Sequence, residues 1–225
     1  MAIGQNLRVS SKVFRASMAV AVPVGLYGAA FGAASISAGL DLLQTVALSS
    51  ILFSGASQFA IVGVIGSGGG AIAAILASAL LGIRNGFYAL RMAPLLEAQG
   101  LRRLIAAHIT IDEATAVALA QDQEDRNLVR KGFWFTGIGV FIFWNLFTIV
   151  GALSASILED PSKWGLDSAV PAAFLALLWP QLTSRRLRII ALLAMVMALA
   201  LSPFLAAGLP IISVVLIALI AGWRK

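Results

Sequence analysis

Residues 54–94 read SGASQFAIVGVIGSGGGAIAAILASALLGIRNGFYALRMAP, and this stretch decides how the chain folds. It is apolar enough for a lipid bilayer, yet it contains a small polar cluster, a glycine run and an arginine, Arg84, beside Asn85. Hydrocarbon tolerates broken backbone and a buried charge only where protein or a cavity covers them. The stretch therefore predicts a pathway through a membrane protein rather than a plain anchor.

The rest of the chain is similarly apolar. Only 12% of the 225 residues are charged, whereas soluble domains have roughly 25%. A spanning helix needs about 20 apolar residues, and no amphipathic pattern typical of a soluble core survives in the uncharged runs. We predict an all-α polytopic membrane protein with seven to eight transmembrane helices, some short or broken, in one domain over residues 1–225. The runs without Asp, Glu, Lys or Arg are 16–40, 42–83, 132–158, 168–184 and 189–223.

The charged residues orient the chain in the cytoplasmic, or inner, membrane. Arg8, Lys12 and Arg15 precede the first predicted span, so the positive-inside rule predicts a cytoplasmic N-terminus. The same rule accounts for the net charge of +6 without a nucleic-acid partner. The spans that the sequence defines most clearly are 16–36, 42–62, 133–156, 168–183, 188–205 and 209–223.

The middle of the chain allows two topologies. In the first, residues 71–90 span outward and residues 104–121 span back. In the second, residues 66–83 re-enter the membrane and residues 84–131 stay in the cytoplasm. The first topology leaves several arginines on the outer side, against the positive-inside rule.

A possible internal repeat relates the two parts of the chain. Residues 39–55 and 165–181 both begin Gly-Leu-Asp, continue into a short uncharged segment and reach a helix-weakening pair. We therefore consider repeat halves 13–121 and 130–225, since transporters are often built from such repeats; chance similarity between apolar segments is the alternative. Asp41 and Asp167 would cap the helices that follow them. Pro23 and Pro180 are candidates for gating or helix termination.

The residue inventory argues against several kinds of site. The chain has no cysteine and one histidine, His108, which excludes thiolate and multi-histidine metal sites. We expect no cofactor, no metal and no enzymatic activity, because neither an activated nucleophile nor a paired-carboxylate array lies in a span.

Four motifs follow one another along the chain: GASQF (55–59), LGIRNGFY (81–88), the pair Asp112 and Glu113, and GLDSAVPAAF (165–174). Together they resemble the AzlC-type branched-chain amino acid permeases over nearly the whole chain, although family members commonly carry Arg-His where Arg84 and Asn85 stand here. The resemblance implies proton-driven export of leucine, isoleucine and valine, with methionine in some members. It also implies a small AzlD-type membrane partner.

Two other functions stay open from the sequence. One is transport of another small amino acid or organic solute, and the other is a membrane assembly subunit without a pathway of its own. The partners that we expect are the substrate, protons, the lipid bilayer, the AzlD-type subunit and a second copy of this chain.

The polar residues in apolar segments are the candidates for substrate binding. Arg84 can give a carboxylate a two-point contact, or its side chain can snorkel to the interface. The small polar residues can bind substrate or can simply let helices approach closely. Asn145 is either pore lining or a hydrogen bond between helices. The full candidate set is Ser54, Gly55, Ser57, Gln58, Gly68, Gly69, Gly70, Arg84, Asn85, Tyr88 and Asn145.

Proton coupling needs a carboxylate or histidine whose access to solvent changes. The candidates are Asp112, Glu113 and His108. Asp112 and Glu113 would point about 100° apart on a helix, and His108 would lie one turn before Asp112, where the two could pair. The alternative is a solvated cytoplasmic surface.

Overall fold

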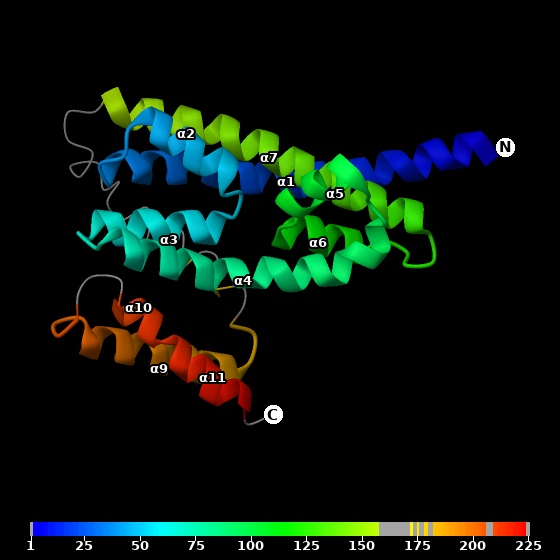
Figure 1. Cartoon of the computed structure of the whole chain (residues 1–225). Helices are drawn as coiled ribbons and strands as arrows, with labels where there is room; N and C mark the ends of the chain where they lie inside the picture. The colour runs from blue at the N-terminus through cyan, green and yellow to red at the C-terminus, as the bar shows by residue number, and fades with distance from the viewer. Residues whose placement is uncertain are drawn as a thin grey trace.

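The computed structural model describes residues 2–157, 172, 175, 178–179, 182–205 and 209–223. Every element in the described part of the chain is an α-helix (Figure 1), which confirms the predicted all-α class. The helices are α1 (Ala2–Ser37), α2 (Leu42–Ile51), α3 (Gly55–Gly66), α4 (Ala71–Leu96), α5 (Gly100–His108), α6 (Asp112–Leu119), α7 (Arg126–Ile157), α9 (Arg185–Leu201), α10 (Leu209–Ser213) and α11 (Val215–Trp223).

Three helices are long and apolar enough to cross a bilayer. They are α1 over Ser10–Ser37, α4 over Ala71–Leu96 and α7 over Arg126–Ile157. Their length and composition, together with the shorter apolar helices, identify an all-α membrane protein. The total of seven to eight spans stays a prediction, because part of the chain lies outside the described residues.

Helices α1 and α7 form the closest pair in the structure (Figure 1), and glycines bring them together. A Cβ atom at Gly28 would overlap the Trp144 carbonyl, and one at Gly151 would overlap the backbone of Ala29. Small residues let backbones approach closely in a membrane, where packing replaces the hydrophobic effect as the force between helices.

The predicted single span 42–62 is wrong. The helix ends at Ile51, a new helix begins at Gly55, and the chain turns back between them (Figure 1). At 1.5 Å per residue, α2 and α3 are about 15 and about 18 Å long, roughly half of a 30 Å hydrocarbon core. They therefore form a half-length hairpin, here called hairpin 1, with its tip at residues 52–54.

The middle of the chain matches neither predicted topology completely. Helix α4 is continuous, so the 66–83 re-entrant segment is wrong and the 71–90 helix is confirmed. The expected continuous helix 104–121 is also wrong, because the chain breaks at residues 109–111 between α5 and α6. This second pair of short helices, hairpin 2, points its tip toward that of hairpin 1 (Figure 1).

The second copy of the possible repeat motif, residues 165–181, falls largely outside the described residues. This applies to Asp167 and Pro180, and the repeat halves stay a prediction. Within the described part, α9 ends at Leu201, four residues before the predicted end of the span 188–205. The predicted span 209–223 is divided into α10 and α11.

Candidate functional site

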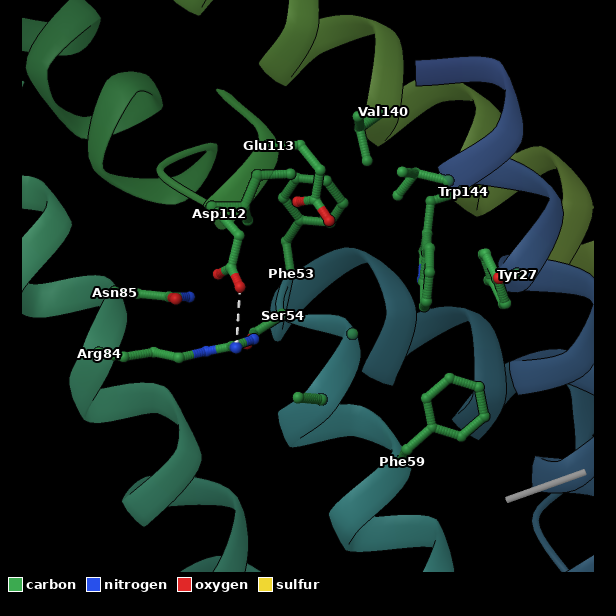
Figure 2. A pocket seen from close by; sticks show the side chains of 14 residues that line it. Tyr27, Phe53, Ser54, Phe59, Arg84, Asn85, Asp112, Glu113, Val140 and Trp144 are labelled. Carbon is green, nitrogen blue, oxygen red and sulfur yellow. Dashed lines mark ion pairs between the residues drawn. The ribbon is translucent and has the colours of Figure 1, made fainter. Parts of the chain in front are cut away.

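A cavity of about 80 Å³ lies where the two hairpin tips meet. A water molecule needs roughly 10–15 Å³ on this measure, so the space holds several waters or a small solute. We call it the central cavity (Figure 2). Its lining residues come from α1, hairpin 1, α4, hairpin 2 and α7: Val24, Tyr27, Phe53, Ser54, Gly55, Ala56, Phe59, Arg84, Asn85, Ile111, Asp112, Glu113, Val140 and Trp144.

An ion pair crosses one end of the central cavity. Arg84 Nη1 on α4 lies 2.8 Å from Asp112 Oδ2 on α6, as Figure 2 shows. The two side chains are 40% and 34% exposed, so the pair is open to whatever occupies the cavity. Exposed ion pairs contribute little to stability, which makes this pair available for exchange with a ligand.

Both acidic residues of the predicted pair line the central cavity, from the first turn of α6. Carboxylates are favoured there, because the helix dipole places partial positive charge at the N-terminus. Asp112 is bonded to Arg84, whereas Glu113 forms no ion pair with any described residue. The cavity therefore contains one neutralised carboxylate and one that lacks a cation.

The tip of hairpin 1 adds backbone donors to this polar end. Ser54 precedes α3 but makes no side-chain cap bond; its hydroxyl donates instead to Ser57 Oγ at 3.1 Å. The first amides of a helix have no partner within that helix. Gly55 and Ala56, which begin α3, line the cavity, so their N–H groups are suited to an anion.

Aromatic rings form the opposite wall of the central cavity. Tyr27 from α1, Phe59 from α3 and Trp144 from α7 surround this end, as Figure 2 shows. Phe59 and Trp144 meet edge to face with ring centroids 6.3 Å apart, an arrangement that aromatic pairs prefer. A Cβ atom at Gly55 would lie 2.9 Å from the Trp144 ring, so the glycine makes room for the indole.

Three of the predicted binding residues instead join helices. Ser57 donates to the Ser78 carbonyl on α4 at 3.0 Å. Gln58 is fully buried, and its amide bonds the end of α2 and the Trp144 indole. Asn145 accepts from Ser50 of α2 at 2.9 Å. None of the three lines the central cavity, so they support the walls of the site.

Two candidates on neighbouring helices also lie outside the cavity lining. The His108 ring packs against Phe53 and Phe141, with centroids 5.9 and 5.7 Å away. The expected pairing of His108 with Asp112 is not formed, because the chain breaks between them. Tyr88 lies one turn beyond Arg84 on α4 and is partly buried.

The remaining candidates are structural elements of the helix ends. Gly68 has φ +79°, and the N–H groups of Gly68 and Gly69 bond carbonyls at the end of α3. Gly70 is the N-cap of α4. Asp41 caps α2 and forms a capping box with Gln44. Pro23 lies inside α1.

Sequence reasoning missed the whole aromatic wall. Tyr27 and Trp144 stand in largely apolar segments and Phe59 follows the polar cluster, but no pattern at these positions distinguishes a ring that faces a cavity from one that faces lipid. The local signals were the neighbours of the rings: glycine beside Tyr27, glutamine beside Phe59 and asparagine beside Trp144.

The comparisons with known proteins agree with this architecture. The family model described as AzlC protein matches residues 19–158, which is more than half of the chain and includes every residue named above as lining the central cavity. No curated protein and no solved structure matches the chain. The chain belongs to the AzlC family of membrane transport proteins.

Proposed function

We propose that the protein is a secondary transporter that exports branched-chain amino acids across the cytoplasmic membrane, with its N-terminus in the cytoplasm. One observation carries the proposal: a central cavity between two half-length hairpins has a charged end and an aromatic wall. A branched-chain amino acid has the same division, with two charges at one end and an apolar side chain at the other. Leucine, isoleucine, valine and methionine are the expected substrates.

We further propose that export is coupled to protons through Glu113. A charge at membrane depth is costly unless it is paired or solvated. Asp112 has a cation partner within the described residues and Glu113 has none. A proton neutralises Glu113 where no cation does, and its release on the other side of the membrane would couple transport to the proton gradient. Ser54, Gly55 and Asn85 complete the polar end of the same site.

A small AzlD-type subunit is the proposed partner, on the strength of family membership. This chain supplies lining residues of the central cavity from α1, hairpin 1, α4, hairpin 2 and α7. We therefore expect the partner to affect stability or gating rather than substrate recognition.

Efflux from proteoliposomes tests the proposal. The purified chain is reconstituted alone and with the small subunit, the vesicles are loaded with radiolabelled leucine, and efflux is followed with and without an imposed pH gradient. The expected result is gradient-stimulated efflux that unlabelled isoleucine and valine compete for. Absence of leucine movement in both preparations contradicts the proposal, and movement of another solute from a competition panel reassigns the substrate.

A further inference from the structure

We propose that the Arg84–Asp112 ion pair is itself the receptor for the two charges of an α-amino acid. The ligand carboxylate takes Arg84, the ligand ammonium takes Asp112, and binding opens the pair. The inference rests on the proposed function for its ligand class. It adds which residue holds which charge, and it states that an internal contact competes with the ligand.

Unpaired polar atoms beside the ion pair point to a ligand with both charges. Among the described residues, Arg84 Nε is a buried donor without a hydrogen-bond partner, and Asn85 Oδ1 is a buried acceptor without one. Both residues line the central cavity. Buried polar groups in native proteins are nearly always bonded, so the site lacks one acceptor and one donor. A carboxylate supplies the acceptor and an ammonium supplies the donor.

The geometry of an amino acid matches the pair that it replaces. Arg84 and Asp112 meet at a contact distance of 2.8 Å, and an α-amino acid carries its carboxylate and its ammonium on one carbon atom. Binding therefore replaces the Arg84–Asp112 ion pair by two ion pairs with the ligand, and neither protein side chain is left without a counter-ion. The first amides of α3, at Gly55 and Ala56, add donors for the carboxylate.

The position of the charges also orients the ligand side chain. Figure 2 shows the ion pair on one side of the central cavity and the rings of Tyr27, Phe59 and Trp144 on the other. A ligand whose two charges are held at the ion pair directs its apolar side chain to those rings.

A ligand with only one of the two charges is a poor substitute. An isolated carboxylate competes with Asp112 for Arg84 and leaves Asp112 without a cation. An isolated ammonium leaves Arg84 without an anion. Leaving one partner of this partly buried pair without a counter-ion costs free energy that a ligand with both charges avoids, so the site discriminates against both ligands.

An analogue panel on the wild-type protein tests this discrimination. Binding to the detergent-purified chain is measured by isothermal titration calorimetry for leucine, 4-methylpentanoate, which lacks the ammonium, and 3-methylbutylamine, which lacks the carboxylate. We expect both analogues to bind at least about tenfold more weakly than leucine, because each forfeits a charge-assisted contact. Equal affinity for leucine and either analogue overturns the proposal.

Two substitutions should each increase the affinity for one analogue, and such a gain is more specific evidence than a loss of binding. Asp112→Asn removes the competitor for Arg84, so 4-methylpentanoate should bind the variant more tightly than the wild type, while leucine binds more weakly. Arg84→Gln removes the partner of Asp112, so 3-methylbutylamine should gain affinity instead. A gain of at least about threefold in each case is the expected result, and a damaged fold produces no such gain.

Matched controls and outcomes keep the two proposals separable. Arg91→Gln on the exposed side of α4 and Asp122→Asn in an exposed loop should change none of the three affinities. The charge assignment is overturned if both variants lose binding of both analogues, or if the same analogue gains affinity in both variants. If wild-type leucine is neither bound nor transported, the proposed function itself fails; if leucine is transported but the analogues bind equally well, only this inference fails.

Discussion

The Gln58 side chain accepts a hydrogen bond from Trp144 Nε1 at 2.8 Å, and this contact joins the helix break to the aromatic wall. The same amide donates to the Ser49 and Leu52 carbonyls at the end of α2, at 3.1 and 2.6 Å. A helix that ends inside a membrane leaves carbonyls unsatisfied unless protein groups bond them. Gln58 therefore makes the break at residues 52–54 tolerable and holds the indole against the central cavity.

Replacing Gln58 by alanine should strongly destabilise the protein. The Ser49 carbonyl and the Trp144 N–H would lose their shared partner in a buried setting, while the Leu52 carbonyl would keep its bond from the Ser54 N–H. Each buried group left unbonded costs about 1–3 kcal/mol, so we expect the free energy of unfolding to fall by about 2–5 kcal/mol. Thermal unfolding in detergent, followed by circular dichroism, measures the change.

The matched control is Gln99→Ala. Gln99 is exposed and makes no side-chain cap bond to α5, so its loss should alter the free energy of unfolding by less than about 0.5 kcal/mol. If the Gln58 and Gln99 variants unfold at the same temperature, Gln58 does not stabilise the break.

Tyr27→Ala should reduce selectivity for large apolar substrates. Tyr27 lines the central cavity and is 43% exposed. Removal of its ring therefore widens the cavity on the aromatic side with little damage to the core. We expect the ratio of kcat/KM for leucine over that for alanine to fall about tenfold. Each substrate methylene that packs in an apolar pocket contributes roughly 1–3 kcal/mol.

Tyr27→Phe provides the comparison for that result. The ring stays and only the hydroxyl leaves, so selectivity for leucine should be retained. Counterflow assays in proteoliposomes give both ratios. A selectivity loss in Tyr27→Phe equal to that in Tyr27→Ala would mean that the hydroxyl, and not the apolar ring, recognises the substrate.

The sequence predicted the elements that depend on local composition. The apolar runs located α1, α4 and α7, and the glycines after residue 66 located the loop before α4. Arg84 and Asp112 were identified as chemically active because charges are rare in apolar segments. Such features can be read from one chain because a bilayer penalises each exposed charge and each broken helix wherever it occurs.

The features that depend on long-range packing could not be predicted. Residues 42–62 are uncharged throughout, and the turn at residues 52–54 becomes stable only when Gln58 bonds the freed carbonyls and Trp144 packs on Gly55. The ion pair of Arg84 with Asp112 joins two helices whose relative position no local pattern encodes. Gln58 was expected to bind substrate because its partner Trp144 lies far away in the sequence, and no local pattern indicates that the two side chains bond.

Two glycine substitutions should change stability in opposite directions. A Cβ atom at Gly28 meets the backbone of α7, which cannot yield, whereas a Cβ atom at Gly86 on α4 has no described atom within 4 Å. Gly28→Ala should lower the free energy of unfolding by about 1–3 kcal/mol through overpacking. Gly86→Ala should raise it by about 0.5–1 kcal/mol, because alanine restricts the unfolded chain. Thermal unfolding of both variants checks the signs, and equal shifts would contradict glycine-mediated packing of α1 on α7.

Glu113→Gln should separate proton coupling from substrate binding. The amide keeps the size and polarity of Glu113 but cannot exchange a proton, while the Arg84–Asp112 pair is left intact. We expect leucine counterflow to continue at near the wild-type rate and efflux driven by a pH gradient to fall at least about tenfold. Glu124→Gln, in an exposed loop, is the control and should behave as the wild type. His108→Asn should also preserve coupling, because His108 is not among the lining residues of the cavity and its ring packs on Phe53 and Phe141; loss of coupling in that variant, with Glu113→Gln unaffected, would move the proton site to the histidine.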